Sequence, residues 1–120
     1  MINYLWVFIG GGLGSMLRLG FADYLAKYEF TFPWATFMAN FCASLLLGFF
    51  LAQTLIGPVS DMKKALLMTG FCGGFSTFST FSAESFLLLQ EGQYGYAILN
   101  VGCSIIVCLG GVYLGLKMGS

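Results

Sequence analysis

The residues best suited to contact an ion lie in one short stretch of the chain, residues 70–84. Phe75, Phe78, Phe81 and Glu84 recur there every three residues, so a helix places them along one slowly turning face. Hydroxyl side chains stand between them: Ser76, Thr77, Ser79, Thr80 and Ser82. Aromatic ring edges are electropositive and can contact a partly dehydrated anion without trapping it. The stretch indicates either ordinary packing by a phenylalanine stripe or, because hydroxyls accompany the rings, an anion pathway.

Glu84 ends this stretch with a carboxylate, and two readings of it stay open. Inside a membrane, a carboxylate costs several kcal/mol and marks a functional site by default. Close to a membrane surface, water would solvate the same carboxylate, and its presence would not indicate a functional site.

Polar side chains on two other apolar stretches supply partners for the phenylalanine face. Thr36 and Asn40 are four residues apart, and Tyr96, Asn100 and Ser104 follow one another at the same spacing. Each amide or hydroxyl could simply hold neighbouring helices together. A full column of them on two helices is better explained by a polar track for the same anion.

The glycines and hydroxyls of residues 70–84 also weaken a helix. We expect a break near residues 73–77, where the freed backbone must be buried in protein or line water. Carbonyl oxygens exposed at such a break resemble hard-cation sites of discontinuous membrane helices. The alternative is an unbroken helix whose hydroxyls bond back to their own turn.

Arg18 is the only cation that falls well inside a predicted helix. A structural role would have it reach the membrane surface or pair with Asp23. A functional role would place its fixed positive charge at a pore mouth, where it raises the local anion concentration.

The composition of the chain indicates whether these residues lie in a soluble protein or in a membrane protein. Hydrophobic residues make up 58% of the 120 residues and charged residues 8%, against roughly 45–50% and about 25% in soluble domains. Charge-free runs cover residues 2–17, 30–60, 65–83 and 92–116. A bilayer core of about 30 Å needs roughly 20 apolar residues in a helix. We therefore predict an all-α integral membrane protein, a single domain over residues 1–120 with helices near 3–26, 33–56, 62–90 and 95–117.

The same composition excludes several classes of function. Five basic and five acidic residues give a net charge of zero, which argues against a nucleic-acid partner. Histidine is absent, and no set of nucleophile, base and orienting residue stands out, so we expect no enzyme. The cysteines all lie inside apolar runs, where a thiol usually acts as a small hydrophobe: Cys42, Cys72, Cys103 and Cys108.

Short loops make consecutive helices antiparallel neighbours, and four thin helices favour a homo-oligomer. Three glycine pairs have the spacing of close helix contacts, either within the chain or at a dimer seam: Gly10 and Gly14, Gly70 and Gly74, Gly111 and Gly115. Lys63, Lys64 and Lys117 stand on one side against Lys27 on the other, a weak orientation signal. Insertion in both directions would allow an antiparallel homodimer.

At this point the sequence closely resembles the small bacterial fluoride channels of the Fluc (CrcB) family, over essentially the whole chain. The resemblance lies in residues 10–18 (GGGLGSMLR), in Asn40 within residues 36–48, and above all in residues 70–84 (GFCGGFSTFSTFSAE). It implies a dual-topology homodimer with two antiparallel fluoride pores in the bacterial cytoplasmic membrane. Passive export of fluoride is the implied activity, with no energy source.

The resemblance also implies roles for individual residues. Phe78 and Phe81 are similar to the paired pore-lining phenylalanines, with Asn40 facing them and Arg18 in the vestibule. The backbone carbonyls of Gly73 and Ser76 are similar to the ligands of a Na⁺ ion on the dimer axis. The remaining pore residues implied are Thr36, Ser79, Thr80, Glu84, Tyr96, Asn100 and Ser104.

Two rival classes remain. A proton-coupled small multidrug transporter has a similar size and topology, but it needs a carboxylate within the first helix, where none precedes Asp23. A passive membrane subunit of a larger complex would need no polar column.

Overall fold

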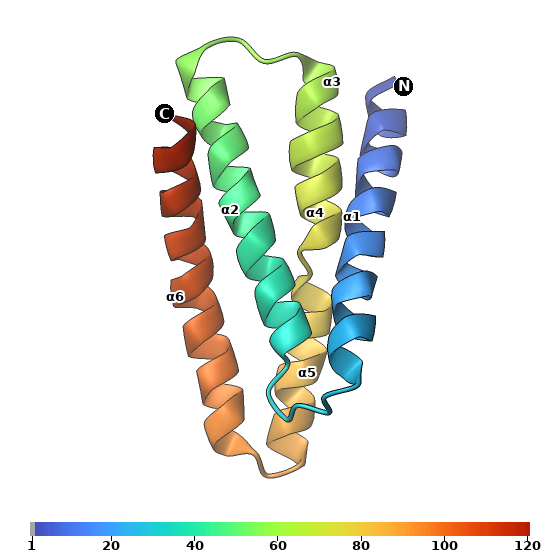
Figure 1. Cartoon of the computed structure of the whole chain (residues 1–120), viewed down its shortest axis with the longest axis vertical. Coiled ribbons are helices and arrows are strands. Elements are labelled where there is room, and N and C mark those ends of the chain that lie inside the picture. The colour runs from blue at the N-terminus through green and yellow to red at the C-terminus, as the bar shows by residue number, and fades with distance from the viewer. Residues whose placement is uncertain (1) are drawn as a thin grey trace.

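The computed structural model describes residues 2–120, and the regular elements in that part of the chain are all helices (Figure 1). The elements are α1 (Ile2–Ala26), α2 (Trp34–Ile56), α3 (Asp61–Lys63), η1 (Lys64–Cys72), α4 (Gly73–Phe75), α5 (Phe78–Gln90) and α6 (Tyr94–Gly119). Because α3, η1 and α4 follow one another without a gap, the chain makes four passes along its long axis. The expected all-α class is confirmed.

Among the helices of residues 2–120, α1, α2 and α6 are long and apolar enough to cross a membrane. The molecule measures 49 Å along its longest axis, more than the roughly 30 Å of a bilayer core. Large apolar side chains such as Phe8, Leu55 and Ile106 point outward and are mostly exposed. In water such a surface would drive aggregation, so the protein is a membrane protein.

The third pass, expected over residues 62–90 with a break near residues 73–77, consists of two parts. Its first part is a helical segment from Asp61 to Phe75, with the wider π-type hydrogen bonding in η1, and its second part is α5. Ser76 (φ −82°, ψ 157°) and Thr77 (φ −152°, ψ 122°) separate the parts with extended backbone. We call these two residues the linker, and Figure 1 shows it as a thin trace between α4 and α5.

The helices pack in two close pairs, α1 against η1 and α4, and α2 against α6. Glycine makes both approaches possible. A Cβ at Gly14 would collide with the Phe71 carbonyl oxygen, and one at Gly115 would collide with the Leu45 carbonyl oxygen. Gly10, Gly70, Gly74 and Gly111 also meet the neighbouring helix. All three glycine pairs therefore pack within the chain.

Small side chains fill the centre between these pairs. The core cluster consists of Ala39 and Ala43 of α2 against the buried ring of Phe75. Phe21 of α1 meets Phe75 edge to face, with ring centroids 5.4 Å apart. The end of α4 is thus anchored between α1 and α2.

Aromatic side chains gather where α1 meets α2. The Lys27 ammonium lies 4.4 Å from the Tyr24 ring centroid, and the rings of Phe32 and Trp34 are 4.7 Å apart. Aromatic residues with a nearby cation are typical of a membrane–water interface. This end of the molecule therefore matches the expected edge of the apolar core.

Candidate functional site

Asn40 of α2 holds the linker through both backbone groups of one residue. The Thr77 backbone N–H donates to Asn40 Oδ1 at 2.7 Å, and Asn40 Nδ2 donates to the Thr77 carbonyl at 3.3 Å. The Thr77 hydroxyl in turn caps α5 by accepting from the Thr80 N–H at 3.1 Å. Backbone groups that an unbroken helix would pair internally are thus paired with side chains.

A small cavity of about 260 Å³ opens beside the linker. It has polar walls from α2 and α6 and aromatic walls from α5. Its lining residues are Asn40, Ser44, Ser76, Thr77, Phe78, Phe81, Ser104, Ile105 and Cys108. The structure therefore brings together Asn40, Phe78, Phe81 and Ser104 of the residues expected to line a pathway.

The two phenylalanines of this cavity differ in their surroundings. The rings of Phe78 and Phe81 lie 5.7 Å apart at 42° to one another. Phe81 is half-buried, whereas Phe78 is 79% exposed. A large exposed ring next to extended, polar backbone marks an open side of the cavity.

Ser79 and Thr80 do not line this cavity. Ser79 is exposed, with its Oγ 3.3 Å from the Thr77 hydroxyl. Thr80 is half-buried and contributes its backbone N–H to the cap of α5.

Thr36 and Glu84 lie away from the cavity, near the end of the molecule where α1 meets α2. Thr36 is buried close to the Glu84 carboxyl. Glu84 Oε1 is enclosed and has no hydrogen-bond partner among residues 2–120. Two further cavities, of about 240 and 330 Å³, meet at Glu84 and also share Glu29.

Asn100 joins α6 to α5 in a buried polar network. Its Nδ2 donates to Ser85 Oγ at 2.8 Å, and its Oδ1 accepts from Ser104 Oγ at 3.3 Å. Asn100 is fully buried, so only Ser104 connects this network to the cavity. Tyr96 stands apart and lines a separate cavity with Phe32.

Arg18 reaches across from α1 to the end of α4. Its Nε donates to the Gly74 carbonyl at 3.1 Å, and Ser15 Oγ donates to the same oxygen at 3.4 Å. Neither the suggested pairing with Asp23 nor any other ion pair to Arg18 is found within the described chain. The suggested Asp23 partner is therefore wrong, because a backbone carbonyl takes its place.

The carbonyl oxygens expected to hold a cation lie on either side of Gly74. Within residues 2–120, no hydrogen bond ends on the Gly73 or the Ser76 carbonyl at the linker. Free carbonyl oxygens are hard ligands of the kind that Na⁺ and Ca²⁺ accept. These two residues therefore fit the chemistry of a hard cation.

The comparison with known families rests on nearly the whole chain. The family model described as CrcB-like protein, Camphor Resistance (CrcB), matches residues 5–116. This chain belongs to the CrcB-like family. The match covers α2 to α5 in full and all but the outer ends of α1 and α6, and the linker and cavity lie within it.

Curated relatives of this CrcB-like protein share close to two-fifths of its residues. A Pyrococcus abyssi protein is 44% identical over 112 residues, covering 92% of this chain and 90% of the relative. A Bacteroides fragilis protein is 38% identical over 123 residues (96% and 97%), and an Opitutus terrae protein is 41% identical over 121 residues (96% and 90%). Each of these relatives is named "Fluoride-specific ion channel FluC".

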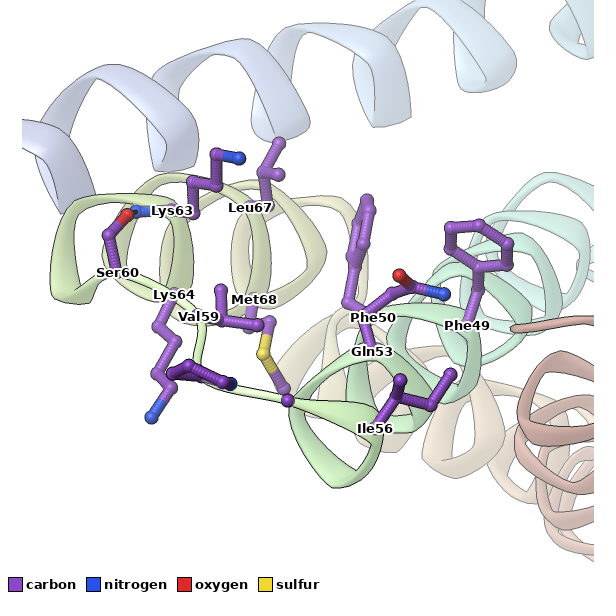
Figure 2. A pocket seen from close by; sticks show the side chains of 12 residues that line it. Phe49, Phe50, Gln53, Ile56, Val59, Ser60, Lys63, Lys64, Leu67 and Met68 are labelled. Atoms are coloured by element: carbon purple, nitrogen blue, oxygen red, sulfur yellow. Dashed lines mark hydrogen bonds between the residues drawn. The ribbon is translucent and has the colours of Figure 1, made fainter. Parts of the chain in front are cut away.

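A larger cavity of this CrcB-like protein lies elsewhere, at the loop that joins α2 to α3 (Figure 2). It measures about 580 Å³ and has mostly apolar walls, including Phe50 and Leu67. Figure 2 shows Lys63 pointing toward α1 and Lys64 pointing away from it. None of the expected site residues lines this cavity, so size alone does not identify the site.

Reasoning from sequence missed several cavity or network residues of this CrcB-like protein, among them Ser44, Ser85 and Cys108. Ser44 extends the spacing of four that runs from Thr36 through Asn40, and this signal could have found it. Ser85 and Cys108 carry no comparable signal, because their roles depend on how α5 packs against α6.

Proposed function

We propose that this protein is a fluoride-specific ion channel that lets cytoplasmic fluoride leave the cell passively. The observation that carries the proposal is the cavity at the linker, which Asn40, Phe78 and Phe81 line together. The names of the CrcB-like relatives point to the same ion. Transport down a gradient needs no catalytic residue, so the protein is a channel and not an enzyme.

The cavity offers donors that suit a small, strongly hydrated anion. Asn40 carries two N–H groups on Nδ2, and the linker uses one of them. The second N–H and the Ser44 hydroxyl are free to donate to fluoride. The ring edges of Phe78 and Phe81 then replace part of the remaining water without a fixed charge, so the ion is able to leave again.

The remaining polar residues extend this path along α5. Ser79 and Thr80 follow the linker, and Ser104 connects the cavity to Asn100. Fluoride would pass between the cavity and water along polar residues that lie toward the membrane surface: Thr36, Glu84 and Tyr96.

A second copy of the chain completes the site in this proposal. One chain leaves Phe78 79% exposed beside polar backbone, and lipid cannot satisfy such backbone. The weak bias of lysines between the two membrane sides allows insertion in both directions. An antiparallel homodimer then carries two pores in the cytoplasmic membrane, each lined by phenylalanines from both subunits, with the linkers at mid-membrane depth.

A Na⁺ ion is the proposed structural cofactor of this dimer. The free carbonyls of Gly73 and Ser76 would hold it on the axis that relates the subunits. When bound, the cation neutralises the carbonyl dipoles of two helix ends that face one another. It takes no part in transport.

Growth in fluoride tests this function in cells. A bacterial strain without its own fluoride exporter should regain growth in millimolar fluoride when it expresses the chain. A multidrug transporter would instead protect against cationic drugs, and a passive subunit would protect against neither. Either of these outcomes, with the chain present in the membrane, would contradict the proposal.

A further inference from the structure

The carbonyl of Gly74 is capped by side chains from another helix. Arg18 Nε donates to it at 3.1 Å and Ser15 Oγ at 3.4 Å, and Arg18 Nη2 lies 3.5 Å from the same Ser15 Oγ. The Gly74 carbonyl oxygen, the Ser15 hydroxyl and the Arg18 guanidinium are thus hydrogen-bonded to one another.

This oxygen needs a partner because the helix ends beside it. In an unbroken helix the Gly74 carbonyl would accept from the Phe78 N–H four residues later. The linker removes that donor, since Ser76 and Thr77 are extended. The neighbouring Cys72 carbonyl is served within its own segment, by the Ser76 N–H at 3.0 Å and the Ser76 hydroxyl at 2.9 Å. Gly74 has no such local donor and relies on α1.

The face of α1 that carries Arg18 packs closely against the end of α4. A Cβ at Gly14 would lie 2.7 Å from the Phe75 N, so only glycine allows the two backbones to meet here. Two turns after Gly14, Phe21 packs edge to face on Phe75. Gly14, Arg18 and Phe21 thus surround the last two residues of α4.

The charge of Arg18 is also well placed for capping. The guanidinium stays protonated in proteins, and a cation is favourable at the carboxyl end of a helix. Arg18 lies at the end of the helical segment Asp61–Phe75, and no acidic side chain pairs with it among the residues described. The negative end of the helix dipole therefore faces the positive charge of Arg18.

We propose that Arg18 is a positioning residue that caps the end of α4 and thereby fixes the linker and Phe78. This inference rests on the proposed channel function, because Phe78 is the group that it positions. It differs from a role in which the arginine only attracts anions to a pore mouth. An attracting charge needs no bond to Gly74, whereas a cap depends on the directional N–H groups of the guanidinium.

Two substitutions separate these roles. Arg18→Lys keeps the charge and loses the guanidinium fork, and Arg18→Gln loses the charge. The cap predicts that both lower the maximal fluoride flux by about tenfold, with no recovery as fluoride is raised. Both should also speed amide hydrogen exchange over residues 73–78. Lys27→Gln removes a cation far from the linker and should leave flux and exchange unchanged.

Other outcomes would overturn the cap. Wild-type flux in Arg18→Lys together with a loss in Arg18→Gln that disappears at high fluoride would show an attracting charge. Unchanged amide hydrogen exchange over residues 73–78 in both variants would also contradict the cap.

Ser15→Ala keeps the proposal testable if the arginine variants do not form folded dimers. It removes one of the side-chain donors to the Gly74 carbonyl and should speed exchange over residues 73–78 to a smaller extent, and wild-type exchange would contradict the cap. The exchange readout does not require transport. A wild-type protein without fluoride flux would therefore refute the channel and leave the cap to be decided separately.

Discussion

Asn40 and Thr77 form a two-point pair, side-chain amide against backbone amide, across the interruption of the third pass. The pair connects α2 to the linker and sets one wall of the cavity. Its geometry allows one residue to serve two purposes, since the amide holds the linker and keeps a free N–H for an anion.

Removing the Asn40 amide should disturb both stability and transport. Asn40→Ala leaves the Thr77 N–H and carbonyl unpaired, which should cost about 1–3 kcal/mol of unfolding free energy. Fluoride flux should fall at the same time, because the cavity loses its amide donor. Thermal unfolding in detergent and flux from liposomes measure the two effects.

Gln53→Ala is the matched control for Asn40→Ala. Gln53 also lies on α2 and donates to a backbone carbonyl, that of Gly119, at 2.8 Å. Its loss should lower stability and leave flux per folded dimer intact. Equal flux in both variants would argue against a special role for Asn40.

Replacing the exposed phenylalanine should reduce transport without unfolding the protein. Phe78→Ile removes an electropositive ring edge from a side chain that the single chain does not bury, so flux should fall by about tenfold. Phe81→Ile should act in the same direction. Phe86→Ile, on the same helix but outside the cavity, should conduct normally, and unchanged flux in all three would contradict a pore-lining role.

The effect of a glycine substitution on α6 should depend on whether the added Cβ meets a neighbouring helix. Gly115→Ala places a Cβ against the Leu45 carbonyl and 2.7 Å from the Phe49 N, which should cost about 1–3 kcal/mol as overpacking. Gly110→Ala meets nothing within 4 Å and should be neutral or stabilising by up to about 1 kcal/mol. Thermal unfolding midpoints measure both, and equal midpoints would contradict the close α2–α6 packing.

Removing Na⁺ should loosen the dimer if the carbonyls of Gly73 and Ser76 hold it. A cation present at about a hundred times its dissociation constant stabilises the bound state by roughly 2.7 kcal/mol. Exchange into N-methylglucamine should therefore lower the unfolding midpoint, and returning Na⁺ should restore it. A midpoint that does not depend on Na⁺ would exclude this site.

Much of the fold could be predicted because lipid imposes simple rules on sequence. Charge-free runs of membrane length indicated α2 and α6, and the shorter run over residues 2–17 indicated α1 once its helix was extended past Arg18. Glycines and hydroxyls indicated where the third pass leaves the helical path, and Ser76 and Thr77 lie inside the range 73–77. These features depend on local composition, which a single sequence contains.

The partners of individual side chains were harder to predict, because they depend on which helices meet. Sequence spacing grouped Asn100 with Tyr96, yet the first is buried against Ser85 and the second lines a different cavity. Arg18 illustrates the same limit. Its acceptor, the Gly74 carbonyl, lies on the distant third pass and is free only because the helix ends there.

Fluoride efflux from liposomes tests the central claim most directly. Purified protein would be reconstituted into vesicles loaded with potassium fluoride or potassium chloride, and release would be followed with ion-selective electrodes after a K⁺ ionophore is added. A fluoride-specific channel should release fluoride rapidly and release little chloride. Release of neither ion from demonstrably folded protein, or equal release of both, would contradict it.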